Sequence, residues 1–301
     1  MTDRHLVRRA AQATFVVPDK YRAHSSGFRR WDVVDESNAV HSDFGVRELD
    51  PDGRIDWHVH SYEESFFVQD GEAVLHTDDG SYALRPGDYG VISVGAPHAW
   101  TGSGDKVMRW AEMSAPQPRA ARDDTFFLKD RGREVEPILV DPRDPRTRSM
   151  GHIEPSNMDA NAQSQDKLAQ SASMRTALLV YSGITVKMMV DSDLGAELLT
   201  TFMVQYEPNG VAGAHDHPLE ESYLVLDGTV DAVFDGQSYR LEVGDLAWAG
   251  VGCVHEFSNP GPGSVRWLET QAPQPPGRHS YRFSRDWTYL RSQLGSDDIH
   301  K

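Results

Sequence analysis

The chain has almost no cysteine, no long hydrophobic run and a deficit of basic residues. Its only cysteine among 301 residues is Cys253. A lone cysteine forms no disulfide within the chain, so nothing here requires an oxidising compartment. No apolar run approaches the roughly 18 residues of a membrane-spanning helix. Residues 1–17 also lack the apolar core of a secretory signal. We therefore expect a cytoplasmic protein.

The charge balance narrows the class of partner. The chain has 30 Lys and Arg against 46 Asp and Glu, a formal net charge of -16 at pH 7. A negative surface repels nucleic-acid phosphates and anionic membranes. We expect neither nucleic acid nor membrane as a partner, and a small molecule as the substrate.

The chain repeats itself. When the sequence is shifted by 157 residues, positions 51–118 align with 208–275 without a gap, and 27 of the 68 pairs are identical. Both copies end in Ala-Pro-Gln-Pro. Self-similarity over this length indicates two versions of one structural unit.

Each unit has the pattern of an all-β fold. Short apolar runs such as SFFVQ and YGVISV alternate with the turn signals QDGE, DDGS and RPGD. Many short strands separated by glycine-rich turns are typical of a β-sandwich or barrel. The predicted organisation is an N-terminal arm (1–42), barrel 1 (43–118), a connector with strands leading into barrel 2 (119–195), barrel 2 (196–275) and a C-terminal segment (276–301). The arms are expected to be short helices or irregular.

One set of polar residues occurs in both copies at the same spacing. On a strand, His58 and His60 point to the same face because side chains alternate. Glu64 and His98 follow at positions that can rejoin that face. Three imidazoles and one carboxylate suit Fe, Mn, Ni, Cu, Zn or Co. The predicted metal ligands of the two copies are His58, His60, Glu64 and His98, and His215, His217, Glu221 and His255.

These residues carry a resemblance to the cupin superfamily. His-x-His-x3-Glu-x6-Gly fits its first motif in both copies, ending at Gly71 and Gly228. The second motif is matched from Gly87 to His98 and from Gly244 to Asn259, with Ser93 and Gly250 in place of a proline and Gly102 in place of the final asparagine. The resemblance implies a bicupin, which has two jelly-roll barrels in tandem with one divalent metal in each. It also implies pairing into a homodimer or higher homo-oligomer.

The sequence favours a redox enzyme without fixing its reaction. Alternation along the strands points four aromatic residues inward near the metals, where they either fill the barrel core or line a substrate pocket: Phe66, Trp100, Tyr223 and Phe257. Such a pocket suits a flat or apolar substrate. The leading hypothesis is an Fe(II) dioxygenase acting on an aromatic, enolic or diketone compound, with Glu64 or Glu221 as a possible base.

Two alternatives stay open. The first is a non-redox isomerase, decarboxylase or hydrolase that uses Mn, Ni or Zn as a Lewis acid. The second is a metal-dependent small-molecule binding protein. The ligands do not distinguish iron from manganese, nickel, zinc or copper, because they suit all five metals.

Overall fold

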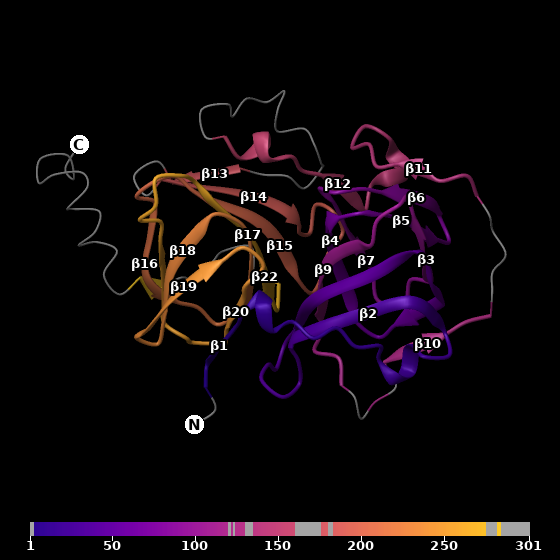
Figure 1. Cartoon of the computed structure of the whole chain (residues 1–301), viewed down its shortest axis with the longest axis horizontal. Coiled ribbons are helices and arrows are strands. Elements are labelled where there is room, and N and C mark those ends of the chain that lie inside the picture. Colours follow the sequence, from indigo (N-terminus) through magenta and orange to yellow (C-terminus); the bar gives the residue numbers. More distant parts are fainter. Residues whose placement is uncertain are drawn as a thin grey trace, which may run out of the picture.

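The fold consists of two β-barrels side by side, shown in Figure 1. The computed structural model describes residues 3–119, 122, 124–129, 135–159, 176–179, 183–274 and 282–283, with the backbone alone for 176–179 and 282–283. Residues 160–175 of the predicted connector and nearly all of the predicted C-terminal segment lie outside this part of the chain. The all-β fold class predicted from the sequence is confirmed. The N-terminal arm, expected to be helical or irregular, instead contributes strands at His5–Arg8 and Ser25–Val34 as well as two short 3-10 turns.

Barrel 1 is a single 11-stranded sheet built around one long strand, β3. The first part of β3 pairs with β9, and its last part pairs with β8. The sheet order is β11-β6-β5-β8-β3-β9-β4-β7-β12, with β2 and β10 also on β3. The strands are β2 (Ser25–Val34), β3 (Asp43–His60), β4 (Glu63–Asp70), β5 (Glu72–Thr77), β6 (Gly80–Leu84), β7 (Asp88–Ile92), β8 (His98–Ser103), β9 (Met108–Ala115), β10 (Thr125–Phe127), β11 (Ile138–Leu139) and β12 (Met150–His152).

Barrel 2 repeats this plan with the long strand divided in two. Its sheets run β1-β20-β17-β22-β15-β14-β13 and β19-β18-β21-β16-β23. The strands are β1 (His5–Arg8), β13 (Thr176–Leu179), β14 (Ile184–Val190), β15 (Thr200–Tyr206), β16 (Val211–Asp216), β17 (Glu220–Asp227), β18 (Thr229–Phe234), β19 (Gln237–Glu242), β20 (Leu246–Ala249), β21 (His255–Ser258), β22 (Val265–Ala272) and β23 (Arg282–Phe283).

Helix plays almost no part in the described residues. They contain only four short 3-10 turns: η1 (Ala10–Gln12), η2 (Asp19–Tyr21), η3 (Pro145–Thr147) and η4 (Pro155–Met158). None of the helices in this part of the chain is long and apolar enough to cross a membrane.

Two strands outside the repeat are exchanged between the barrels. β1, at the N-terminus, pairs with β20 of barrel 2, whereas β12, from the connector, pairs with β7 of barrel 1. Each added strand is held by a side-chain contact to the aspartate of the Gly-Asp turn, an ion pair from Arg9 in barrel 2 and a hydrogen bond with His152 in barrel 1. Arg9 lies 2.6 Å from Asp245, and His152 lies 2.7 Å from Asp88. The added strands cover sheet edges that would otherwise present unpaired backbone groups.

Three hydrophobic clusters account for the core. One fills barrel 1 and includes Trp100 and Trp110, and another fills barrel 2 and includes Trp267. The third joins the barrels, bringing together residues such as Tyr89 of barrel 1 and Trp248 of barrel 2. Because this third cluster is buried, the two barrels pack as one body.

Candidate metal centres

Strand pairing brings the first and last histidines of each set face to face. His58 is directly opposite His98 across β3 and β8, and His215 is opposite His255 across β16 and β21. In both barrels the register shifts just before the first histidine, as at a β-bulge. Bulges of this kind redirect a side chain next to a functional site. The same irregularity in both copies aims the first histidine at the last.

A glycine turn places the last histidine against the second. Gly95 has φ 74° and donates its N–H to the His60 carbonyl at 2.8 Å. In barrel 2, Gly252 has φ 71° and donates to the His217 carbonyl at 3.1 Å. Glycine adopts this left-handed conformation without the cost that a side chain imposes. The glycine of the second motif, Gly95 or Gly252, therefore stabilises the turn that leads into β8 or β21.

The three histidines of each set converge in the structure. Their candidate ligand atoms lie within 4.8 Å of one another, both for His58, His60 and His98 and for His215, His217 and His255. All six side chains are at most 9% exposed. The ring centroids of His58 and His98 are 4.1 Å apart. Those of His215 and His255 are 4.3 Å apart.

Hydrogen bonds at Nδ1 orient the imidazoles in barrel 1. His58 Nδ1 lies 2.7 Å from the Asp56 carbonyl, and His98 Nδ1 lies 3.0 Å from the Ala96 carbonyl. Both bonds require Nδ1 to donate, which leaves the lone pair on Nε2. His98 Nε2 is buried and has no hydrogen-bond partner among the described residues. A nitrogen lone pair in that state fits a metal ligand.

Barrel 2 follows the same arrangement. The Nδ1 atoms of His215, His217 and His255 lie 2.7, 3.1 and 2.9 Å from the backbone carbonyls of Gly213, Leu219 and Cys253. The Nε2 lone pairs are thus left for the interior of this barrel as well.

The glutamate of each set joins the histidines. His60 Nε2 lies 3.2 Å from Glu64 Oε2. Glu221 Oε2 lies 2.8 Å from His217 Nε2 and 3.3 Å from His255 Nε2. The predicted four-residue sets are therefore assembled in both barrels, and their donor atoms fit a divalent metal.

Burial sets the protonation of barrel 1. It lowers the pKa of His60 and of His98 to about 4, so both imidazoles are neutral near pH 7, as metal binding requires. Burial, aided by the Glu112 charge, raises the pKa of Glu64 to about 8. Binding a cation would therefore release a proton from this carboxyl.

The pKa shifts of His217 and Glu221 in barrel 2 run in the opposite direction. Burial acts to raise the pKa of Glu221, but the adjacent His217 outweighs it and lowers that pKa well below the usual range. Burial acts to lower the pKa of His217, and Glu221 reverses this and raises it. The pKa of the glutamate is therefore lowered in barrel 2, whereas it is raised in barrel 1.

The four aromatic residues expected near substrate are packed in the barrel cores. Phe66 and Trp100 are in ring contact at 5.4 Å, and Trp100 stacks on Trp110 at 5.1 Å. Tyr223 and Phe257 are in ring contact at 4.9 Å. All four are at most 5% exposed. Because all four are buried and pack against other aromatic rings, they give no support to an aromatic substrate. Whether any of them touches substrate stays a prediction.

Residues that sequence reasoning missed surround the barrel 1 set. Tyr62 stacks on His60 at 4.2 Å, and the Tyr21 ring lies 5.9 Å from His58. The Thr125 hydroxyl lies 3.2 Å from His60 Nδ1. Tyr21 and Thr125 lie outside the repeated region and carry no motif, so no signal pointed to them. The missed neighbour in barrel 2, Gln271, hydrogen-bonds Glu221 and stands where barrel 1 has Ser114. Comparison of the two copies could have found it.

A third group of potential ligands lies where the N-terminal arm contacts barrel 2. Candidate ligand atoms of His5, Asp235 and Cys253 also lie within 4.8 Å of one another. Asp235, however, is engaged by two hydrogen bonds from Arg4 at 2.8 and 3.0 Å, and His5 Nε2 lies 2.9 Å from the Tyr239 hydroxyl. These contacts attach the arm to barrel 2.

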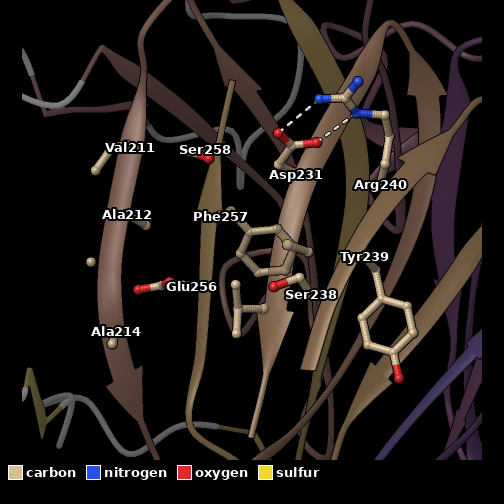
Figure 2. Close-up of a pocket in the computed structure, with 13 residues that line it drawn as sticks. Val211, Ala212, Ala214, Asp231, Ser238, Tyr239, Arg240, Glu256, Phe257 and Ser258 are labelled. Carbon is tan, nitrogen blue, oxygen red and sulfur yellow. Dashed lines mark hydrogen bonds and ion pairs between the residues drawn. The ribbon is translucent and has the colours of Figure 1, made fainter. Parts of the chain in front are cut away.

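A hollow on the surface of barrel 2 lies apart from the ligands. Figure 2 shows it on β16, β18, β19 and β21, with the Asp231–Arg240 ion pair at one end. Ala214 and Val233 line it. The equivalent residues of barrel 1 are Trp57 and His76, which are larger. None of the eight predicted ligands lines the hollow, so it is separate from the two candidate metal centres.

Comparisons with known proteins agree with this architecture. A cupin domain model matches residues 45–114 and 202–270, one match in each barrel. No curated protein matches the sequence.

Solved structures of similar fold are two-domain proteins of comparable length. Oxalate decarboxylase from Lactobacillus farciminis, in a formate complex, gives a TM-score of 0.63 at 14% identity, covering 98% of this chain and 95% of that one. The Bacillus subtilis oxalate decarboxylase, described with Mn(II) centres, gives 0.62 at 14%, covering 97% and 85%. A putative glyoxylate-induced protein from Pseudomonas aeruginosa gives 0.64 at 17%, covering 93% and 92%. With a cupin match in each barrel and this shared fold, the chain is a two-domain cupin.

Proposed function

We propose that the protein is a metal-dependent, non-redox enzyme that decarboxylates a small dicarboxylic or 2-oxo acid, with Mn(II) as its metal. The observation that carries this proposal is the buried set of three imidazoles and one carboxylate in each barrel. Four protein ligands leave positions free on a five- or six-coordinate ion, where a substrate carboxylate can bind. The likeness in fold to manganese-containing oxalate decarboxylases supports the choice of metal and substrate class.

The barrel residues supply binding and proton handling. A bound divalent metal would polarise the substrate carboxylate as a Lewis acid. Loss of CO₂ breaks a carbon–carbon bond and leaves the electron pair on the carbon that had borne the lost carboxylate, which then takes a proton. Glu64 is placed to hold that proton, because its Oε1 has no hydrogen-bond partner among the described residues. Tyr21 and Tyr62 are both buried. Their rings lie against His58 and His60 and so exclude water from that side of the barrel 1 centre.

The Fe(II) dioxygenase expected from the sequence has less support. That expectation depended partly on aromatic side chains lining a substrate pocket. Phe66 and Trp100 instead pack against each other and the core. The likeness in fold to decarboxylases favours the non-redox alternative over the dioxygenase.

Elemental analysis combined with two assays tests the proposal. The purified protein, reloaded with Mn(II), is offered oxalate and small 2-oxo acids while CO₂ is measured, and catechols and β-diketones while O₂ is measured. Manganese-dependent CO₂ release without net O₂ consumption would support decarboxylation. Iron-dependent O₂ uptake would reassign the protein as a dioxygenase, and ligand binding without turnover would indicate a binding protein. The His58→Ala/His98→Ala variant is the matched control for barrel 1.

A further inference from the structure

The two metal centres differ beside their glutamates. In barrel 2 the Tyr223 hydroxyl donates to Glu221 Oε2 at 2.5 Å. The Gln271 side-chain amide donates to Glu221 Oε1. With His217 and His255 also on Oε2, both oxygens of this buried carboxylate are engaged.

Barrel 1 has neither donor. Phe66 stands in place of Tyr223, and Ser114 stands in place of Gln271. Glu64 is 3% exposed, yet its Oε1 has no hydrogen-bond partner within the described ranges. Its other oxygen lies 3.2 Å from His60 Nε2. Among the described residues, Oε1 of Glu64 is therefore without a donor, whereas the Glu221 carboxylate has two donors that barrel 1 lacks, one on each oxygen.

The backbone shows that these differences lie at equivalent places. Gln271 is directly opposite Glu221 across β17 and β22, and Ser114 is opposite Glu64 across β4 and β9. The Phe66 ring leans onto Gly90, where an added Cβ would lie 2.7 Å from the tip of the ring. Barrel 2 has Ala247 at that position. The contrast thus arises from side-chain identity on the same scaffold.

We propose that the two centres have divided roles. Tyr223 and Gln271 are positioning residues that fix Glu221 as a permanent ligand, so barrel 2 holds its metal tightly. Glu64, which lacks both donors, can move away from the metal, so barrel 1 exchanges metal faster and is the centre where substrate binds. Hydrogen bonds to a ligand typically change metal affinity by about 10–100-fold. The first part of the proposal, the difference in metal affinity between the barrels, stands by itself. The second part, the assignment of substrate to barrel 1, rests on the proposed function.

Metal release from the intact protein tests the first part. Protein loaded with Mn(II) at both sites is mixed with excess EDTA, and the manganese retained after rapid gel filtration is measured over time. We expect two phases whose rates differ by about tenfold or more. Tyr223→Phe and Gln271→Ser should each accelerate the slow phase by about tenfold and leave the fast phase unchanged. Tyr206→Phe is the matched control, because it removes a hydroxyl from another buried tyrosine of barrel 2 that packs against Trp267.

Two further measurements identify which barrel gives each phase. His58→Ala/His98→Ala should abolish the fast phase. Ser114→Gln, which introduces the barrel 2 donor into barrel 1, should slow it. A single phase in the wild type, or a slow phase that neither Tyr223→Phe nor Gln271→Ser alters, would overturn the division of roles. Neither of these two results depends on whether a variant that lacks a metal ligand can fold.

Oxalate binding tests the second part separately. The Mn(II) EPR spectrum is recorded with and without oxalate, before and after EDTA removes the fast-exchanging metal. Oxalate should change the spectrum only while the fast-exchanging metal is present. A change that persists afterwards would place substrate in barrel 2 and overturn the assignment of substrate to barrel 1. Two phases with the expected variant effects but no response to any small acid would contradict the proposed function and leave the difference in metal exchange standing.

Discussion

Glu63 and Glu220 make the same contacts in opposite directions across the boundary between the barrels. Glu63 of barrel 1 accepts the backbone N–H groups of residues 197–199 at 2.8, 3.0 and 3.2 Å. Glu220 of barrel 2 accepts those of residues 40–42 at 2.7, 3.0 and 3.2 Å. Both carboxylates are 2% exposed. All of these positions differ by 157, so the repeat in the sequence is also a pseudo-two-fold arrangement in space.

Removing either carboxylate should destabilise the boundary by a similar amount. Glu63→Ala and Glu220→Ala each leave three backbone N–H groups without their acceptor. We expect each to lower the free energy of unfolding by about 3 kcal/mol, measured by urea unfolding of the metal-free protein. The exposed Glu72 provides the control, and Glu72→Ala should change stability by less than about 0.5 kcal/mol. Losses as small as the control's would show that these contacts do not hold the barrels together.

Paired histidine substitutions should empty the metal sites one at a time. His58→Ala/His98→Ala is expected to leave about one equivalent of metal, in barrel 2, and His215→Ala/His255→Ala about one in barrel 1. Elemental analysis after reloading and desalting gives the stoichiometry. If both variants keep the wild-type metal content, the ligand assignment is wrong.

The hydroxyl of Thr125 should matter to one site alone. It lies 3.2 Å from His60 Nδ1, so Thr125→Val removes a hydrogen-bond partner of a predicted ligand. We expect metal affinity in barrel 1 to fall about tenfold, with barrel 2 unchanged, in a competition titration against a chelator. Thr101→Val is the matched control, because that hydroxyl lies 2.8 Å from Nε2 of His76, which is not a predicted ligand. Equal effects of the two substitutions would contradict a role for Thr125 in orienting His60.

Asp43 should make stability depend on pH. Burial raises the pKa of Asp43 to about 7, although the nearby Arg47 acts to lower it and Asp32 to raise it further; Arg30 and Glu112 also face it. The folded state therefore binds more protons than the unfolded state between the ordinary pKa, near 4, and about 7. Stability from this group is present at low pH and falls as pH rises through that window.

Replacement of Asp43 by asparagine should remove that dependence. We expect the free energy of unfolding of Asp43→Asn to fall less than that of the wild type between pH 4 and 7, the difference being on the order of 1–4 kcal/mol. Urea unfolding of the metal-free proteins at several pH values measures it. The exposed Asp52 gives the control Asp52→Asn. A variant that loses as much stability as the wild type would show that Asp43 is ionised throughout the range.

The sequence predicts most of the fold and the composition of the candidate site. Alternating apolar residues and turn glycines mark the strands, and His58 and His60 share a face because strand periodicity is two. The candidate ligands can also be picked out by comparing the two copies, because chance does not repeat a set of three histidines and one glutamate at the same spacing. The ligand assignment, the oligomeric state and the cytoplasmic location all stay predictions.

What the sequence does not predict depends on contacts between distant segments. Nothing in residues 5–8 indicates pairing with β20, because a short edge strand carries no information about its partner. Phe66 and Trp100 alternate correctly to point inward, but pattern alone does not distinguish the lining of a pocket from a packed core. The four-residue motif likewise says nothing about Gln271, whose role depends on cross-strand pairing with Glu221.

The exchange of β1 and β12 has a consequence for how the chain can be divided and how it arose. β1, which precedes barrel 1 in the sequence, completes barrel 2, and β12, which precedes barrel 2, completes barrel 1. Cutting the gene directly after the first repeat would therefore remove an edge strand from each barrel. The same exchange between two identical single-barrel chains would give a closed, symmetric, domain-swapped dimer. The present chain has the form of such a dimer after gene duplication and fusion, an event that freed two once-identical halves to diverge.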